Sequence, residues 1–102
     1  MIRRDKMLEI GTIVYLKKGS QKLMVIGRGV VVPDGKISKI YDYAACLYPL
    51  GFVSERTYYF NEENVDKVLF RGYHDDEEDR FTELYKKWQE DNKNDYEKGS
   101  LL

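Results

Sequence analysis

The chain contains very few of the side chains that bind metals or act as nucleophiles. Of its 102 residues, one is cysteine and one is histidine. A single cysteine cannot form an internal disulfide, and one cysteine with one histidine gives too few ligands for a zinc site. Cys46 lies in the apolar run Ala44-Ala45-Cys46-Leu47, which favours a small buried hydrophobe. We therefore expect no metal, no cofactor and a reducing compartment.

Three further patterns resemble catalytic or ligand sites only in part. His74 lies in a polar segment and Cys46 in an apolar one, which argues against a nucleophile and base pair. The acidic run at 75–79 lacks the alternating ligands and turn glycine of a calcium loop. Gly27-Arg28-Gly29 lies within a strand pattern, so it indicates a β-bulge rather than a phosphate loop. We expect no catalytic residues, and hence a protein that is not an enzyme.

The chain also lacks an excess of charge and any long hydrophobic run. Seventeen basic and eighteen acidic residues give a formal net charge of −1, which disfavours DNA and anionic membranes as partners. No apolar run is long enough to cross a membrane, and residues 1–6 do not lead into a signal-peptide core. We expect a cytoplasmic protein. A small RNA-binding β-barrel stays open as an alternative, with a groove lined by Arg3, Arg4, Lys17, Lys18, Lys22 and Arg28.

Most of the chain has strand patterns separated by turn residues. β-Branched and aromatic residues predict strands over 12–16, 22–32, 40–48, 52–60 and 65–70. Pro33-Asp34-Gly35-Lys36 predicts a turn, and Asn61 is placed to cap a short turn over 62–64. This spacing predicts a small curved antiparallel sheet, or an SH3-like partial barrel, over residues 8–73.

The period changes after residue 75. Phe81, Leu84, Tyr85 and Trp88 follow the i, i+3, i+4, i+7 spacing of one helix face. Acidic residues at 75–79 suit the positive end of a helix dipole. We predict a helix over 75–93, with its apolar face packed on the sheet, and a mobile tail over 94–102. The whole chain, 1–102, is then one α+β domain.

Tyrosine is the commonest aromatic residue, and the tyrosines gather around the third and fourth predicted strands. Alternate members of this group would fill the core and leave the others scattered on the surface. The competing interpretation is an aromatic patch around Pro49-Leu50-Gly51 that anchors a protein partner. Trp88 either docks on the sheet or contacts a partner helix. The candidate partner-binding residues are Tyr43, Tyr48, Leu50, Phe52, Tyr58 and Trp88.

An ordered set of short segments carries a family resemblance. The segments are residues 10–17, 22–28, Tyr41-Asp42-Tyr43, 46–52 and Tyr59-Phe60-Asn61, followed by Gly72-Tyr73 and an acidic helix. In this order they resemble the EsaE-like family, small proteins of Firmicutes encoded in type VII (Ess) secretion loci and long described as a domain of unknown function. The resemblance spans about residues 8 to 90.

The resemblance implies an accessory role without catalysis. Proteins of this kind look like cytoplasmic chaperones or targeting factors for a polymorphic toxin, often LXG-like, encoded in the same locus. They would help to deliver that toxin to the membrane ATPase of the secretion machine. Leu47 to Phe52 match the family's Leu-Tyr-Pro-x-Gly-Phe segment, and Leu50 stands where relatives often have an acidic residue.

Overall fold

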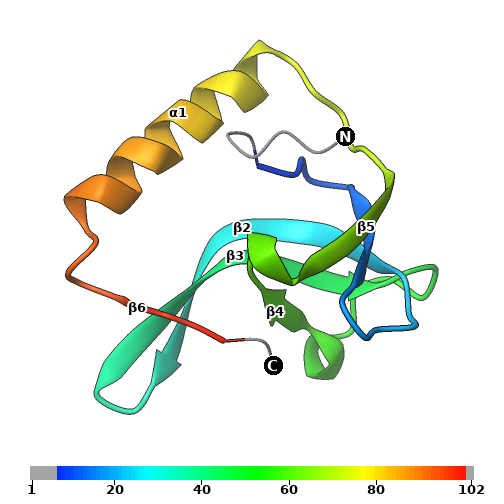
Figure 1. The fold of residues 1–102 in the computed structure, drawn as a ribbon, viewed down its shortest axis with the longest axis horizontal. Helices are drawn as coiled ribbons and strands as arrows, with labels where there is room; N and C mark the ends of the chain where they lie inside the picture. Colours follow the sequence, from blue (N-terminus) through cyan, green and yellow to red (C-terminus); the bar gives the residue numbers. More distant parts are fainter. Residues whose placement is uncertain (1–6, 101–102) are drawn as a thin grey trace.

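A computed structural model describes residues 7–100, which form an open antiparallel sheet with one α-helix beside it (Figure 1). The elements are β1 (Ile13–Leu16), β2 (Leu23–Asp34), β3 (Ile37–Leu47), β4 (Tyr58–Phe60), β5 (Val65–Phe70), α1 (Asp76–Asp91) and β6 (Glu97–Lys98). The strand order is β4-β3-β2-β1-β5, and β6 adds to β3 in parallel. This arrangement confirms the predicted α+β fold, with about five strands and a C-terminal helix.

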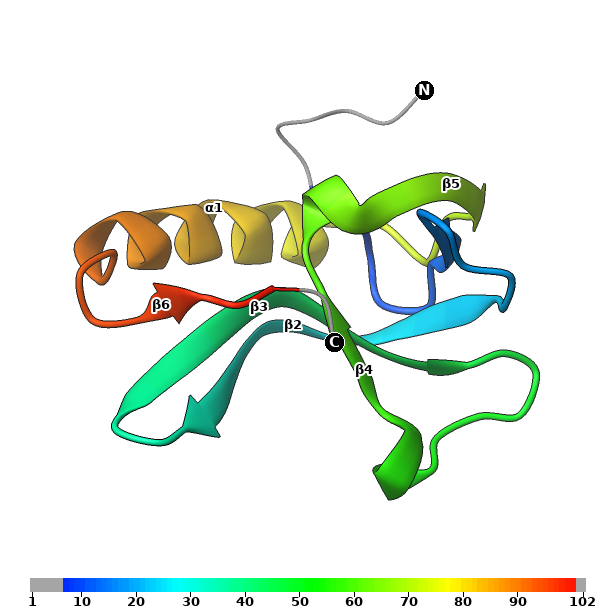
Figure 2. The ribbon, with the colours of Figure 1, turned by 60° about the horizontal axis from the view of Figure 1, so that its bottom comes forward.

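The long β2–β3 hairpin forms the centre of the sheet. Asp34 pairs with Ile37 across the predicted turn. The register shifts by one residue between the pairs Val25–Ala45 and Gly27–Ala44, so the predicted bulge is confirmed. The hairpin is bent, with α1 over the half that carries the turn and β5 over the other half (Figure 2).

The hydrophobic core lies among the strands and the segment before β1, and α1 contributes no buried residue to it. Leu8, which precedes β1, and Phe60 of β4 are both fully buried although they lie far apart in the sequence. The buried cluster consists of Leu8, Val14, Leu16, Leu23, Val25, Tyr43, Ala45, Phe60 and Val65. The core therefore depends on pairing between distant strands.

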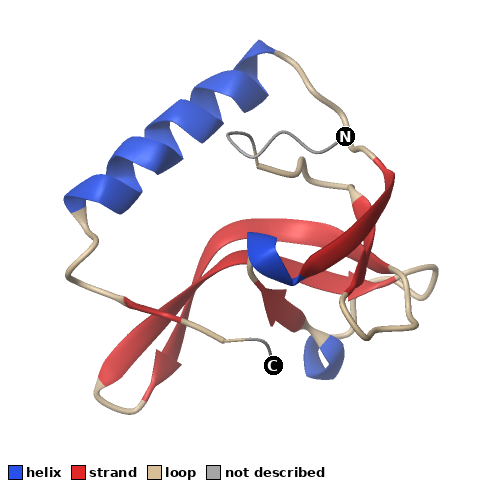
Figure 3. Ribbon diagram, viewed as in Figure 1, coloured by secondary structure: helices blue, strands red, loops and turns tan. Residues whose placement is uncertain are grey.

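Two predicted segments differ from the structure. The predicted strand over 52–60 is a strand only at Tyr58–Phe60, because Ser54–Arg56 form a 3-10 helix. A second 3-10 helix, Glu62–Asn64, follows β4 (Figure 3). The prediction of a mobile tail is wrong at Glu97–Lys98, which pair with Lys39 and Ile40. Residues 101 and 102 of that predicted tail lie outside the described residues.

Helix α1 begins next to Asp75, as predicted, but packs on the sheet over a smaller part of its apolar face than predicted. The Asp75 side chain accepts a hydrogen bond from the Glu78 N–H at 3.1 Å, as an N-cap does. Tyr85 lies against Gly29 of β2, where an added Cβ would be 2.5 Å from the Tyr85 ring. Leu84 stays 54% exposed. The predicted apolar face of the helix therefore covers the sheet only in part.

Arg28 joins the helix to the sheet through charge. Its guanidinium forms an ion pair with Glu78 of α1, and both side chains are only 9% exposed. The same group lies 4.2 Å from the centroid of the Phe81 ring and donates to the Leu8 carbonyl at 3.4 Å. A buried charge is destabilising unless it is paired, so these contacts fix where α1 sits.

His74 makes a second polar link at the start of the helix. Its Nδ1 lies 2.7 Å from Oε2 of Glu9, and its Nε2 lies 2.7 Å from Oδ1 of Asp79. Because a carboxylate only accepts, both ring nitrogens donate when His74 is an imidazolium, and these bonds raise its pKa. Burial raises the pKa of Glu9, but hydrogen bonds from Arg71 and His74 outweigh burial and lower it overall.

Substituting Gly29 tests the contact with the helix. Gly29→Ala adds a methyl group against Tyr85 at a φ of +60°, whereas Gly35→Ala meets nothing within 4 Å at a φ of +66°. Both variants carry a backbone cost of about 1 kcal/mol, and Gly29→Ala adds about 1–3 kcal/mol of overlap. Urea denaturation should show that Gly29→Ala lowers the free energy of unfolding more than Gly35→Ala does, and this difference should vanish in a Tyr85→Ala background. Equal losses of stability for the two variants in the wild-type background would contradict the contact between Gly29 and Tyr85.

The His74 link predicts a pH dependence of stability. The pKa of His74 is raised from 6.5, so its contribution is complete below pH 6.5 and is lost as the pH rises through the folded-state pKa. The pKa of Glu9 is lowered from 4.5, so its contribution is present above pH 4.5 and is lost as the pH falls through the folded-state value. Chemical denaturation from pH 4 to pH 9 should show the alkaline loss in the wild type and not in His74→Gln. A loss of the same size in His74→Gln would assign it to another group.

Candidate functional site

The loop between β3 and the first 3-10 turn exposes large apolar side chains to solvent. Within residues 48–52, called the 48–52 loop below, Tyr48 is 43%, Leu50 57% and Phe52 66% exposed. The Gly51 N–H donates to the Leu47 carbonyl at 2.8 Å, Gly51 has a φ of +94°, and the Tyr48–Pro49 peptide is cis. The loop is thus closed on the end of β3 with its apolar side chains outward.

The β1–β2 turn lies beside this loop. The Tyr48 N–H donates to the Lys22 carbonyl at 2.9 Å, and the Lys22 ammonium lies 6.0 Å from the centroid of the Tyr48 ring. Tyr58 is half-buried at the start of β4 and lines a hollow of about 470 Å³ together with residues of the turn. Four of the six predicted residues, Tyr48, Leu50, Phe52 and Tyr58, therefore lie at the loop or at the adjoining turn.

Tyr43 is fully buried, so the prediction that it contacts a partner at the surface is wrong. Its ring packs on Phe60 with centroids 5.3 Å apart. Its hydroxyl accepts from the Leu8 N–H at 2.8 Å and donates to Glu62. Burial and the bond to Glu62 raise the Tyr43 pKa far above its usual value. Tyr43 thus ties the segment before β1 to the sheet.

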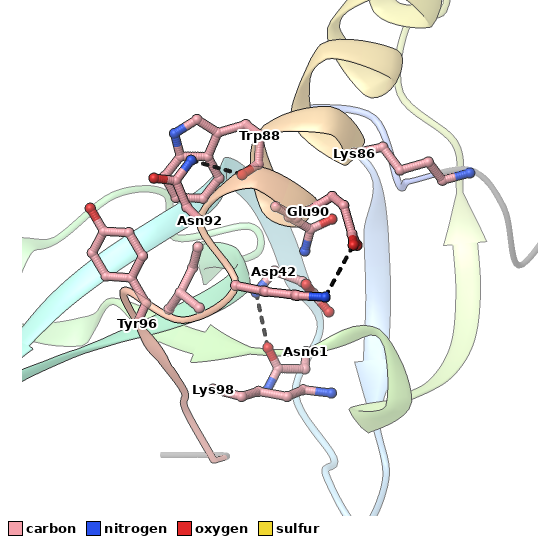
Figure 4. Close-up of a pocket in the computed structure, with 11 residues that line it drawn as sticks. Asp42, Asn61, Lys86, Trp88, Glu90, Asn92, Tyr96 and Lys98 are labelled. Atoms are coloured by element: carbon pink, nitrogen blue, oxygen red, sulfur yellow. Dashed lines mark hydrogen bonds and ion pairs between the residues drawn. The ribbon is translucent and has the colours of Figure 1, made fainter.

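Trp88 lies at a different place in the fold. It lines a pocket of about 490 Å³ between the end of α1, β3 and the tail (Figure 4). Ile40 of β3 also lines this pocket. Ile40 and Leu47 are seven residues apart on β3, or roughly 23 Å at about 3.3 Å per residue. The structure therefore does not bring Trp88 together with the 48–52 loop.

The polar groups of this pocket mostly bind one another. The Asp42 N–H donates to Asn61 Oδ1 at 3.0 Å, and the Asn61 amide donates to the Gly99 carbonyl at 2.8 Å. Burial raises the pKa of Asp42, although the Glu62 N–H that donates to its carboxylate works in the opposite direction. The Trp88 ring stacks on Tyr96, with centroids 5.5 Å apart. These contacts hold the tail against β3, which is a structural role.

Cys46 and His74 are both engaged by the fold. The Cys46 side chain is buried in β3, and the two ring nitrogens of His74 face carboxylates. The His74 side chain is 38% exposed, and the absence of catalysis stays a prediction. Within residues 7–100, no group of three or more His, Cys, Asp or Glu side chains is arranged to hold a metal. The helix of this part of the chain is too short and too polar to span a bilayer.

Sequence reasoning missed the contacts that attach the helix. An arginine between two glycines in a strand is unusual, and this pattern could have marked Arg28 as a special position. The pattern does not reveal its partner Glu78, which is fifty residues away. No local pattern distinguishes Glu9 from other surface acids, although it is 4% exposed. Both depend on long-range pairing.

The fold and its exposed loop define a small α+β domain with an apolar surface patch. The chain belongs to the family described as a domain of unknown function (DUF4176), whose profile matches residues 7–81. Neither a search of curated proteins nor a search of solved structures gave a significant match. The matched part contains the sheet and the 48–52 loop, whereas Trp88 and β6 lie beyond it.

Removing one hydroxyl tests the assignment of Tyr43 to the core. Tyr43→Phe leaves the Leu8 N–H without its acceptor and should reduce the free energy of unfolding by about 1–3 kcal/mol. Tyr48→Phe is the matched control, since Tyr48 is exposed, and should change stability by less than about 0.5 kcal/mol. Equal effects in urea denaturation would place the Tyr43 hydroxyl in water.

Proposed function

We propose that this protein is a cytoplasmic accessory factor without catalytic activity that binds a cargo protein and promotes its export by type VII secretion. The observation that supports protein binding is the 48–52 loop. Leu50 and Phe52 keep more than half of their surface in water, at a free-energy cost that contact with a partner would relieve. Side chains of this size dominate the centres of protein interfaces.

The way the loop is held also favours binding. Both ends are tied by backbone hydrogen bonds, from Gly51 to Leu47 and from Tyr48 to Lys22. A loop already ordered before association loses less conformational entropy when it binds. The 48–52 loop therefore suits an anchor that meets its partner with little rearrangement.

The identity of the cargo rests on the resemblance to EsaE-like proteins. This resemblance supports a polymorphic, LXG-like toxin encoded in the same locus as the cargo, with the membrane ATPase of the secretion machine as a second binding partner. In this role the protein would hold the toxin in the cytoplasm until it is exported.

The RNA-binding alternative has less support. Arg28 of the predicted basic groove is buried against Glu78, so it is not available to a phosphate. Arg3 and Arg4 of that groove lie outside the described residues. Lys17, Lys18 and Lys22 remain, and they gather at the β1–β2 turn rather than along a groove of aromatic side chains.

Co-expression with the toxin gene of the same locus tests the proposal. We expect the wild-type chain to co-purify with the toxin, and Leu50→Asp or Phe52→Asp to lower the affinity about thirtyfold, the equivalent of about 2 kcal/mol at an interface anchor. Leu84→Asp is the matched control, because Leu84 is equally exposed on α1. Isothermal titration gives the affinities, and thermal melting checks that each variant folds.

Two outcomes would contradict the proposal. A wild-type chain that stays alone in the presence of the toxin would remove the secretion role. A toxin complex that tolerates both loop variants and is lost in Leu84→Asp would move the interface to the helix.

A further inference from the structure

The hollow beside the 48–52 loop has an apolar floor. It measures about 470 Å³, within the usual range for ligand pockets. Leu16 and Leu23, from the two strands that flank the β1–β2 turn, are 8% and 4% exposed and contribute to the floor, and Tyr58 completes the lining from β4. The hollow has room for a large apolar side chain from outside the chain.

The rim of the hollow is basic. Lys17 and Lys18 line it, and Lys22 stands between two lining residues, Gln21 and Leu23, without lining it itself. No ion pair joins Lys17, Lys18 or Lys22 to a carboxylate of the described residues, whereas Lys39, Lys93 and Lys98 form ion pairs. Lys17 lies close enough to Glu63 to help Lys98 lower the pKa of that carboxyl, so Lys18 and Lys22 are the lysines of this turn with no such acidic neighbour among the described residues. The chain as a whole carries a net charge of −1, so this concentration of positive charge is local.

Two other occupants fit the hollow less well. Single-stranded RNA binds by stacking bases on aromatic rings, and the floor here is mainly aliphatic. A second copy could offer Tyr73, 80% exposed beside acidic residues, but Glu78 and Asp79 of that run already bind Arg28 and His74. Such a contact would also be head-to-tail and would leave a free hollow at the end of any assembly that does not close into a ring.

We infer that the hollow receives a large apolar side chain from an acidic segment of a protein partner, whose carboxylates pair with Lys17, Lys18 and Lys22. This rests on the proposed function only in that the partner is a protein. The 48–52 loop contributes apolar contact beside the hollow, and the lysines select the sign of the partner's charge. The association rate then falls as salt is added.

Selection from an unbiased library tests this inference without the toxin. Phage displaying short random peptides are selected on the full wild-type chain, and the enriched peptides are synthesised. We expect net acidic sequences with a large apolar residue, and amide shifts on binding at Leu16, Leu23 and Tyr58. Lys18→Glu combined with Lys22→Glu should weaken these peptides about tenfold or more. Lys36→Glu with Lys87→Glu is the control of equal charge on exposed residues elsewhere.

The inference would be overturned if no peptide is enriched, or if the enriched peptides show no acidic bias. Amide shifts confined to the pocket of Figure 4 would also overturn it. So would peptides that bind the Lys18→Glu, Lys22→Glu variant as tightly as they bind the wild type. Salt-dependent binding of poly-uridine at the turn, or oligomers that Tyr73→Ala dissolves, would assign the hollow to RNA or to a second copy. Acidic peptides that bind here while the toxin does not would retain the inference and remove the secretion role.

Discussion

The buried charge of Arg28 is the constraint on which the arrangement of the molecule depends. The bulge in β2 lies just before this arginine, which stands between Gly27 and Gly29, and Gly29 lets the Tyr85 ring of α1 approach closely. A guanidinium with so little exposure needs an anion and hydrogen-bond acceptors nearby. Glu78 and the Leu8 carbonyl supply them, so one side chain joins the sheet, the helix and the segment before β1.

This mode of attachment explains why α1 lies against the sheet without contributing a residue to the hydrophobic core. Glu78 and Asp79 hold the first turns through Arg28 and His74, and the ring of Tyr85 rests on Gly29. Hydrophobic burial is concentrated instead among the strands, where Leu8 and Phe60 are fully enclosed. The helix is therefore held mainly by polar groups, which respond to pH and salt more than a packed apolar face does.

Much of the fold follows from local patterns, because strands, turns and the helix each leave a periodic or compositional signal. The bulge, the short turn that begins after Asn61 and the start of α1 are all confirmed on that basis. The remainder depends on partners far along the chain. Glu97–Lys98 has no strand pattern and becomes β6 only because β3 offers an open edge. Tyr43 can be buried because distant groups form hydrogen bonds with its hydroxyl.

The same reasoning explains why the site was predicted only in part. Leu50 lies in a turn that interrupts a strand pattern and Phe52 follows that turn, and such connecting segments run over the protein surface. The hollow of the β1–β2 turn forms only when β4 brings Tyr58 beside Leu16 and Leu23, which no local pattern indicates. Helix α1 lies over the half of the hairpin that carries the turn (Figure 2), so the other end of the sheet is free to present an apolar loop and the lysines of the β1–β2 turn together.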